Sequence, residues 1–179
     1  MTAQPKRRLV VGSDDAGIDM ARAVVAFLTD DPRIEVVTDM SGRGEEMYPE
    51  VAIRVGEAIA HGEFDRGILI CGTGIGVSIT ANKVPGIRAA VVHDEYSLER
   101  SILSNDCQIV CFGSRIIAVP LSLRFVDRWL DFSFDARSKS SPKLDKISEF
   151  EDRLRAEWRL EEAAPSSEPI NPTYGEKQP

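Results

Sequence analysis

The sequence predicts an α/β fold, a Rossmann-like three-layer sandwich with a five-stranded parallel sheet and an extra C-terminal helix. Short apolar segments typical of buried strands occur five times along the chain. Segments with a helical apolar stripe separate them, as in 16–29, where Ile18, Ala21, Val25 and Leu28 share one face. Strands that alternate with helices form a parallel sheet covered on both faces. The expected strands are 8–13, 34–38, 67–71, 87–92 and 107–112.

The expected helices follow the same pattern. Pro49 suits the first turn of a helix that runs to about His61. A glycine-rich turn after the third strand opens a helix that ends near Lys83. The remaining helices are expected at 97–103, 121–130 and 143–160.

One domain is expected over residues 1–160, followed by a disordered tail over 161–179 that is rich in Pro, Ser and Glu. The helix over 143–160 comes after a completed sheet and carries one apolar stripe. That stripe can cover its own domain or pack on a second subunit, and the spacing favours neither.

Composition excludes several classes of protein. The formal net charge of −7 argues against a general nucleic-acid binder, because such proteins present basic surfaces. No apolar run reaches the roughly 18 residues of a membrane span, and the polar start does not resemble a signal peptide. Three cysteines without metal-ligand spacing indicate reduced thiols. We therefore expect a cytoplasmic protein without a zinc site, and we expect no cofactor.

The most informative segment is the glycine-rich turn Cys71–Gly76, which reads CGTGIG. Ligands of parallel α/β sheets bind at the carboxyl ends of the strands, and this turn follows the third strand. A dinucleotide fingerprint would follow the first strand with different glycine spacing, and a P-loop would carry a Lys before Ser or Thr. Neither pattern is present.

Cys71 stands where a thiol can act as a base. A helix start lowers the pKa of a thiol from about 8.5 toward neutrality, and such a base removes a proton from carbon efficiently. The amides of Gly72, Gly74 and Gly76 could hold an enediolate oxygen, and the Thr73 hydroxyl could assist them. The alternative is that Cys71 simply fills apolar space, which is also the interpretation of Cys107 and Cys111 within their strand.

Asp14 and Asp15 follow the first strand. They could orient sugar hydroxyls or bind a cation, and one of them could simply cap the next helix. Receiver domains also place an acidic pair here, but they need a phosphoacceptor Asp at the end of the third strand. Cys71 occupies that position, which argues against a receiver domain.

Several motifs occur together in one order and resemble a known family. They are GSDDAG at 12–17, Tyr48–Pro49, ILICGTGIG at 68–76, ANK at 81–83, GIRAA at 86–90, Asn105–Asp106 and GSR at 113–115. Over about residues 8–150 the chain is similar to the ribose-5-phosphate isomerase B/galactose-6-phosphate isomerase (RpiB/LacAB) family.

The resemblance implies a metal-free aldose–ketose isomerase of a sugar phosphate. It also implies a homodimer, with a tetramer as a further option, in which each active site lies at the subunit interface. Cys71 matches the enediolate base, while Thr73 and the glycine amides match the groups that handle substrate oxygens. Asp14, Tyr48 and Asn105 match substrate-contacting positions, and Arg115 matches a phosphate contact. Arg137 and Lys143 are further candidates for phosphate contacts. The basic segment in which they lie can also be a solvent-exposed face without a ligand.

Three positions depart from the family pattern. Asp15 and Ser104 replace histidines linked to ring opening or phosphate contact, and Ile102 replaces an arginine. Tetrose 4-phosphates have no free hydroxyl that can close a five-membered ring, so their isomerase needs no ring-opening acid. The segment 103–110 also resembles the erythritol-pathway branch, which favours conversion of D-erythrulose 4-phosphate to D-erythrose 4-phosphate. The alternatives are ribose 5-phosphate or galactose 6-phosphate as substrate, or a non-catalytic sugar-phosphate-binding relative.

Overall fold

A computed structural model describes residues 6–42 and 46–163 of the chain. Most of the segment expected to be a disordered tail, residues 164–179, lies outside the described residues. Residues 161–163 continue the last helix, which begins at Ser141 and ends at Ala163.

The central layer is a parallel sheet of five strands, as predicted. Its spatial order is β2-β1-β3-β5-β4, and every neighbouring pair is parallel. The prediction of Cys107 within a strand is wrong, because β5 starts two residues later. The predicted strand 87–92 is likewise reduced to three paired residues. The strands are β1 (Arg7–Ser13), β2 (Ile34–Asp39), β3 (Arg66–Cys71), β4 (Ala89–Val91) and β5 (Ile109–Gly113).

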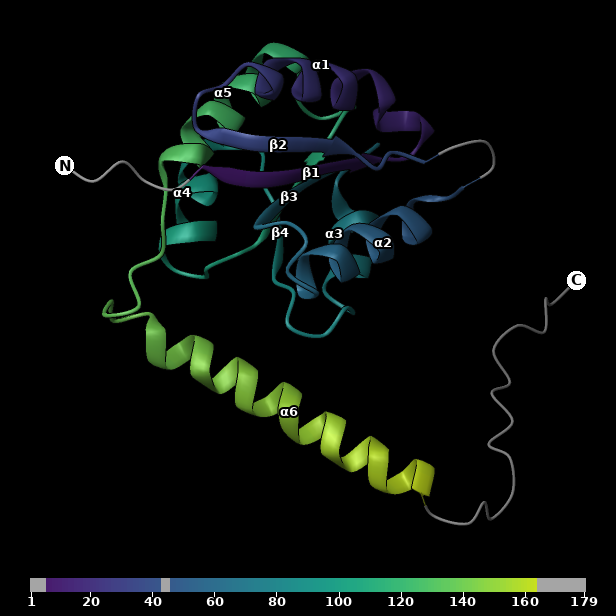
Figure 1. The fold of residues 1–179 in the computed structure, drawn as a ribbon, viewed down its shortest axis with the longest axis vertical. Coiled ribbons are helices and arrows are strands. Elements are labelled where there is room, and N and C mark those ends of the chain that lie inside the picture. The colour runs from purple at the N-terminus through teal and green to yellow at the C-terminus, as the bar shows by residue number, and fades with distance from the viewer. Residues whose placement is uncertain (1–5, 43–45, 164–179) are drawn as a thin grey trace, which may run out of the picture.

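Two helical layers cover the sheet (Figure 1). Helices α1, α4 and α5 bury one apolar cluster against one face, and α2 and α3 bury another against the opposite face. Successive strand residues such as Leu9, Val10 and Val11 are therefore all fully buried. A short 3-10 helix (Asp15–Gly17) precedes α1 (Ile18–Thr29), and the other helices are α2 (Tyr48–Ala60), α3 (Ile75–Ala81), α4 (Glu95–Leu103), α5 (Val119–Asp131) and α6 (Ser141–Ala163).

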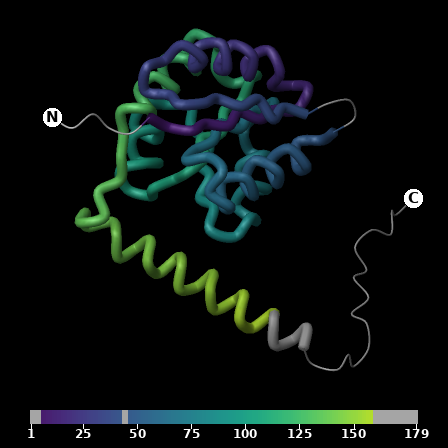
Figure 2. The backbone as a smooth tube through the Cα atoms, viewed as in Figure 1, coloured from purple at the N-terminus to yellow at the C-terminus, as the bar shows by residue number. Residues whose placement is uncertain are grey.

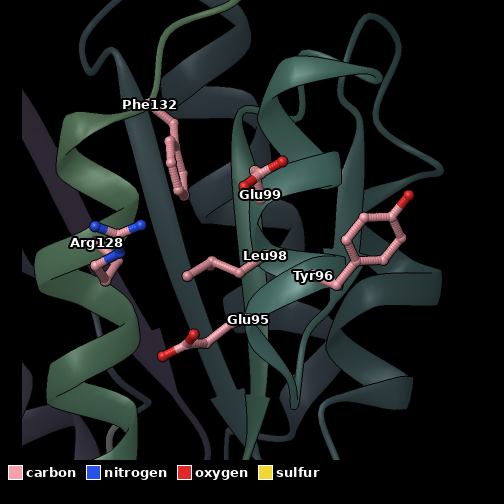
Figure 3. Close-up of a pocket in the computed structure, with 6 residues that line it drawn as sticks. All are labelled: Glu95, Tyr96, Leu98, Glu99, Arg128 and Phe132. Atoms are coloured by element: carbon pink, nitrogen blue, oxygen red, sulfur yellow. The ribbon is translucent and has the colours of Figure 1, made fainter.

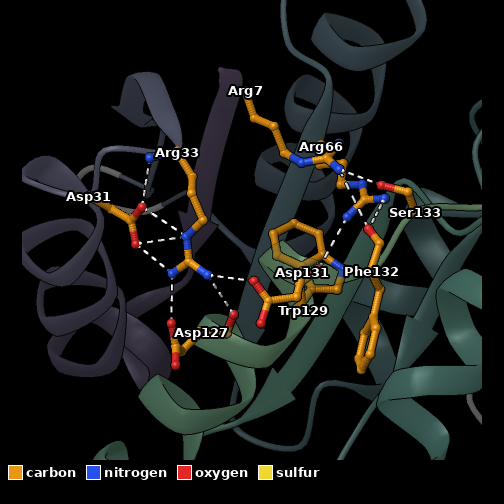
Figure 4. A network of polar contacts seen from close by, with 9 residues as sticks. All are labelled: Arg7, Asp31, Arg33, Arg66, Asp127, Trp129, Asp131, Phe132 and Ser133. Atoms are coloured by element: carbon orange, nitrogen blue, oxygen red, sulfur yellow. Dashed lines mark hydrogen bonds and ion pairs between the residues drawn. The ribbon is translucent and has the colours of Figure 1, made fainter. Parts of the chain in front are cut away.

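Two arginines fix the C-terminal part of α5 (Figure 4). Arg66 donates to the carbonyl oxygens of Trp129 at 3.3 Å and Phe132 at 2.9 Å, and burial lowers its pKa to about 10. On the neighbouring surface, Arg33 pairs with three carboxylates, those of Asp31, Asp127 and Asp131, at 2.6, 2.6 and 2.9 Å. These contacts tie α5 to the strands and to the α1–β2 connection, away from the carboxyl ends of the strands.

Helix α6 leaves the sandwich and runs past its edge (Figures 1 and 2). It touches its own domain at the loop before β4, where both carboxylate oxygens of Glu151 accept from the Gly86 amide at 2.8 and 3.0 Å. Ile147, Phe150 and Trp158 nevertheless remain 51%, 52% and 61% exposed. The helix thus combines an intramolecular contact with an uncovered apolar surface. None of the helices in the described ranges is both long and apolar enough to cross a bilayer.

Candidate active site

The glycine-rich turn holds the thiol of Cys71 by a main-chain donor. Cys71 ends β3, and the amide of Gly74 donates to its Sγ at 3.1 Å. Gly74 has φ of +77°, a conformation that glycine adopts without the strain of a Cβ atom. The Cys71 side chain is 5% exposed and packs in the apolar cluster with Val77 and Cys111. The sulfur therefore lies beneath the turn, with little of it open to solvent.

The turn is pressed against the end of β5. A Cβ atom on Gly113 would lie 2.7 Å from the carbonyl carbon of Thr73, and one on Gly74 would lie 3.0 Å from that of Phe112. Thr73 is exposed, and its hydroxyl accepts from the Ile75 amide at 3.3 Å. Because the two backbones touch, β5 sets the position of the amides that surround Cys71.

Tyr48 reaches the same turn from the start of α2. A Cβ atom on Gly76 would lie 2.7 Å from Cε2 of the Tyr48 ring. Glycine at position 76 therefore lets the ring lie on the first turn of α3. Tyr48 itself is 40% exposed, so its hydroxyl borders the solvent beside the turn.

Asp14 caps the short helix after β1, as one of the alternatives predicted. Its Oδ1 accepts from the Gly17 amide at 3.2 Å. Partial burial raises the pKa of Asp14 and the neighbouring charge of Asp15 adds to this, while the Gly17 amide opposes the rise. Asp15 is exposed and accepts from the Ala16 amide at 2.9 Å. The two carboxylates thus stand side by side in different environments.

Arg115 places a cation over the turn. Its amide donates to the carbonyl oxygen of Gly72 at 3.1 Å, and its guanidinium carbon lies 3.4 Å from where a Cβ atom on Gly72 would be. Its charge also acts to lower the pKa of Asp14, against the larger effect of burial. Among the described residues, the guanidinium forms no hydrogen bond or ion pair. The carboxyl ends of β1, β3 and β5 therefore bring Asp14, Cys71 and Arg115 together.

Neither histidine of the chain is a free acid beside Cys71. The Nε2 atom of His93 accepts from the Gly113 amide at 3.1 Å, and burial lowers the pKa of His93. The hydrogen bond and the lowered pKa both favour the neutral imidazole. His61 is exposed at the end of α2, which is the opposite end from Tyr48.

Three predicted site residues lie away from this turn in the single chain. Asn105 follows α4 and precedes β5, whereas Cys71 pairs with Gly113 at the far end of β5. The four residue steps between Ile109 and Gly113 correspond to about 13 Å. Arg137 and Lys143 are exposed, in the α5–α6 connection and in the first turn of α6 respectively.

Four pockets lie elsewhere on the described surface, and Cys71 lines none of them. One of about 250 Å³ lies between α4 and α5, where Glu95 and Glu99 face Arg128 and Phe132 (Figure 3). No group of three or more possible metal-ligating side chains occurs among residues 6–42 and 46–163.

Arg88 belongs to the GIRAA motif at 86–90, but nothing in the sequence indicates a role for its side chain. Arg88 binds the turn that carries Asn105, with its Nε atom 2.9 Å from the Asn105 carbonyl oxygen. The sequence offers no direct signal for this contact, because the two residues are separated by helix α4.

Comparisons with known proteins agree on one family. The model of the family described as Ribose/Galactose Isomerase matches residues 9–147. D-erythrulose-4-phosphate isomerase 2 of Mycolicibacterium smegmatis is 43% identical, over 80% of this chain and 97% of that protein. D-erythrulose-4-phosphate isomerase of Pectobacterium atrosepticum is 42% identical, over 80% and 94%. The structure of Clostridium thermocellum ribose-5-phosphate isomerase B is 40% identical and covers 82% of this chain and 99% of its own, with a TM-score of 0.76.

Proposed function

Because the chain belongs to the ribose/galactose isomerase family and is a sugar-phosphate isomerase, we propose that its substrate is a tetrulose 4-phosphate and that Cys71 is its base. The reaction would convert D-erythrulose 4-phosphate to D-erythrose 4-phosphate. The observation that carries the role of Cys71 is the hydrogen bond from the Gly74 amide to its Sγ at 3.1 Å. A main-chain donor of this kind stabilises a thiolate, the form that accepts a proton.

The proposed reaction moves one proton between neighbouring carbons. Cys71 takes the proton from C1 of the ketose, and the electrons of that C–H bond form the C1–C2 double bond of an enediolate. The amides of Gly72 and Gly76 are the donors we assign to the developing oxygen anion, because the Gly74 amide already donates to the Cys71 sulfur. The proton of the C1 hydroxyl passes to the C2 oxygen, and Cys71 returns its proton to the C2 carbon, which gives the aldose and restores the Cys71 thiolate.

The surrounding groups match the remaining parts of the substrate. Asp14, whose pKa is raised by burial, can hold a substrate hydroxyl, and the Tyr48 hydroxyl borders the same turn. Arg115 supplies a guanidinium that has no protein partner among the described residues. A phosphate dianion is the ligand that such a cation binds best.

The absence of a free imidazole beside Cys71 supports a four-carbon substrate. A pentose or hexose phosphate rests mainly as a ring and needs an acid to open it, whereas a tetrose 4-phosphate remains open-chain. In this chain Asp15 is an exposed carboxylate, and the acceptor nitrogen of His93 is occupied by the Gly113 amide. The two relatives described above as D-erythrulose-4-phosphate isomerases agree with this choice.

We expect the purified protein to convert D-erythrulose 4-phosphate with a kcat/KM at least about 100-fold above that for ribose 5-phosphate, since lack of ring-opening acid catalysis costs about that factor. The measurement is a panel of tetrulose, pentulose and hexulose phosphates and their aldoses. Comparable kcat/KM values for ribose 5-phosphate would contradict the tetrose assignment. Binding of a sugar phosphate without solvent deuterium entering C1 or C2 would instead indicate a non-catalytic binder.

We further propose that the enzyme is a homodimer in which a second copy completes each site. Asn105 matches a substrate-contacting position of the family. In its own chain, however, it lies near the amino end of β5, whereas Cys71 lies beside the carboxyl end of that strand. Apolar side chains remain exposed on α3 and α6 and offer a surface for association. On α3, Ile75 and Ile79 are 54% and 58% exposed. On α6, the side chains of Ile147, Phe150 and Trp158 are exposed to a similar degree.

Subunit mixing tests the shared site. Cys71→Ala and Asn105→Ala proteins should each be nearly inactive, but a hybrid would contain one site with both residues intact. If the subunits exchange freely in an equal mixture, about a quarter of wild-type activity should return, because half of the dimers are hybrids with one of two sites complete. A mixture that stays inactive although mass spectrometry detects hybrid dimers would contradict the shared site.

A further inference from the structure

We propose that Arg88 is a positioning residue that fixes the turn Asn105–Asp106 and thereby presents the Asn105 side chain to substrate. This inference rests on the proposed function, in which Asn105 contacts the sugar phosphate. Arg88 lies in the loop before β4, and its side chain reaches across to the segment between α4 and β5.

The guanidinium of Arg88 binds the turn through three acceptors. Nε donates to the carbonyl oxygens of Asn105 at 2.9 Å and Asp106 at 3.1 Å. Nη2 donates to the same Asp106 carbonyl at 2.7 Å and to its carboxylate at 2.9 Å. A planar guanidinium that satisfies several acceptors at once restricts the position of both peptide groups.

The turn needs such a restraint because its backbone is strained. Asp106 has φ of +44°, and it is the one residue other than glycine with positive φ in the described ranges. An L residue with a Cβ atom holds this conformation only where surrounding contacts impose it. The amide of Asp106 donates to the Ile102 carbonyl at 3.0 Å, which closes the end of α4. Arg88 supplies the contacts on the other side of the turn.

This geometry leaves one end of the Asn105 carboxamide available. Its Nδ2 atom donates to the Arg100 carbonyl at 3.0 Å, whereas its Oδ1 atom accepts no hydrogen bond from the described residues. The side chain is exposed. A hydroxyl group of a substrate bound by a second subunit is a donor that fits this oxygen.

The loop that carries Arg88 is itself anchored. Gln108 accepts from the Arg88 amide at 2.9 Å and donates to the Gly86 carbonyl at 3.0 Å. The Gly86 amide is bound in turn by Glu151 of α6. The Arg88 side chain is 23% exposed, so water competes only partly with its acceptors. Arg88 therefore transmits the position of a fixed loop to Asn105.

A double-mutant cycle tests whether Arg88 acts through Asn105. We expect Arg88→Met to lower kcat/KM on D-erythrulose 4-phosphate by about 10- to 100-fold, which is the usual effect of a misplaced contact. In the Asn105→Ala background the same change should have an effect of less than about twofold, because the group it positions is gone. Arg33→Met is the matched control. It removes another arginine with three acceptors, in this case the carboxylates of Asp31, Asp127 and Asp131 (Figure 4), and neither Asn105 nor Asp106 is among its partners.

Two kinetic outcomes would overturn the inference. One is a full, independent loss from Arg88→Met in the Asn105→Ala background, and the other is kcat/KM within twofold of wild type in folded Arg88→Met. Arg88→Lys provides a second variant if Arg88→Met does not fold. Lysine retains the positive charge but lacks the planar guanidinium that binds several acceptors at once, so this variant should lower kcat/KM similarly.

The side-chain amide signals of Asn105 in NMR spectra provide a readout that does not depend on activity. We expect Arg88→Met to shift or broaden them and Arg33→Met to leave them in place. Unchanged signals in Arg88→Met would overturn the inference, whereas failure of the proposed function would show as a wild-type protein with no isomerase activity.

Discussion

Replacement of Cys71 by Ala is expected to lower kcat on the tetrulose phosphate by about 10³-fold, because a positioned general base contributes about 10²- to 10⁴-fold. The loss should be in kcat, since the glycine amides and Arg115 still bind the substrate. Incubation of the variant in D2O should show no deuterium at C1 or C2 by NMR. A thermal shift on addition of the sugar phosphate should persist and show that the site remains formed.

Cys111→Ala is the matched control for this variant. Cys111 lies on the neighbouring strand β5 in the same apolar cluster as Cys71, and it is fully buried. Burial raises the pKa of Cys111, so its thiol remains neutral. Each substitution removes one sulfur atom from the cluster, but only the one at position 71 removes the acceptor of the Gly74 amide. Equal loss of kcat in both variants would show that cavity formation, rather than loss of the base, impairs the enzyme.

The sheet was predictable because apolar segments of strand length alternate with amphipathic helices. The same signal overestimated two strands for one physical reason. Ile87 and Cys107 are 6% exposed, yet both lie outside the strand ladder. Apolar residues in a sequence indicate which side chains are buried, but they do not show directly which residues form the backbone hydrogen bonds of a sheet. Where an apolar residue is buried in a loop, the predicted strand extends too far.

The site was predictable in part, and the division follows the direction of the chain. Asp14 and Arg115 follow strands and Cys71 is the last residue of one, and the carboxyl ends of parallel strands lie at the same end of the sheet. Asn105 follows helix α4, which runs back to the amino ends of the strands. No local pattern predicts whether Asn105 contributes to the site of its own chain or to that of the proposed second subunit. The contact of Arg88 with Asn105 also requires β4 to pair with β5 rather than with β3, the strand before it in the sequence. That order depends on packing of the whole sheet, which single segments do not specify.

The geometry of the turn can be tested by adding one methyl group. We expect Gly74→Ala to destabilise the protein by at least about 2 kcal/mol, since positive φ costs an L residue about 1–2 kcal/mol before any steric contact is counted. The new Cβ atom would lie 3.0 Å from the Phe112 carbonyl carbon and 3.2 Å from the Cys111 carbonyl oxygen. The turn must then move away from β5, and the Gly74 amide moves with it from the Cys71 sulfur. A displacement near 1 Å at such a site lowers kcat by about 100-fold.

Gly62→Ala separates strain from displacement. Gly62 has φ of +76°, nearly the same as the +77° of Gly74, but a Cβ atom there would meet nothing within 4 Å. The Gly62→Ala variant should therefore lose only about 1 kcal/mol of unfolding free energy and retain its kcat. Urea unfolding of both variants at the same protein concentration measures the loss of stability. If the two variants lost equal stability and Gly74→Ala kept full activity, β5 would have yielded to the methyl group. The contact between the turn and β5 would then not determine where the donor to Cys71 lies.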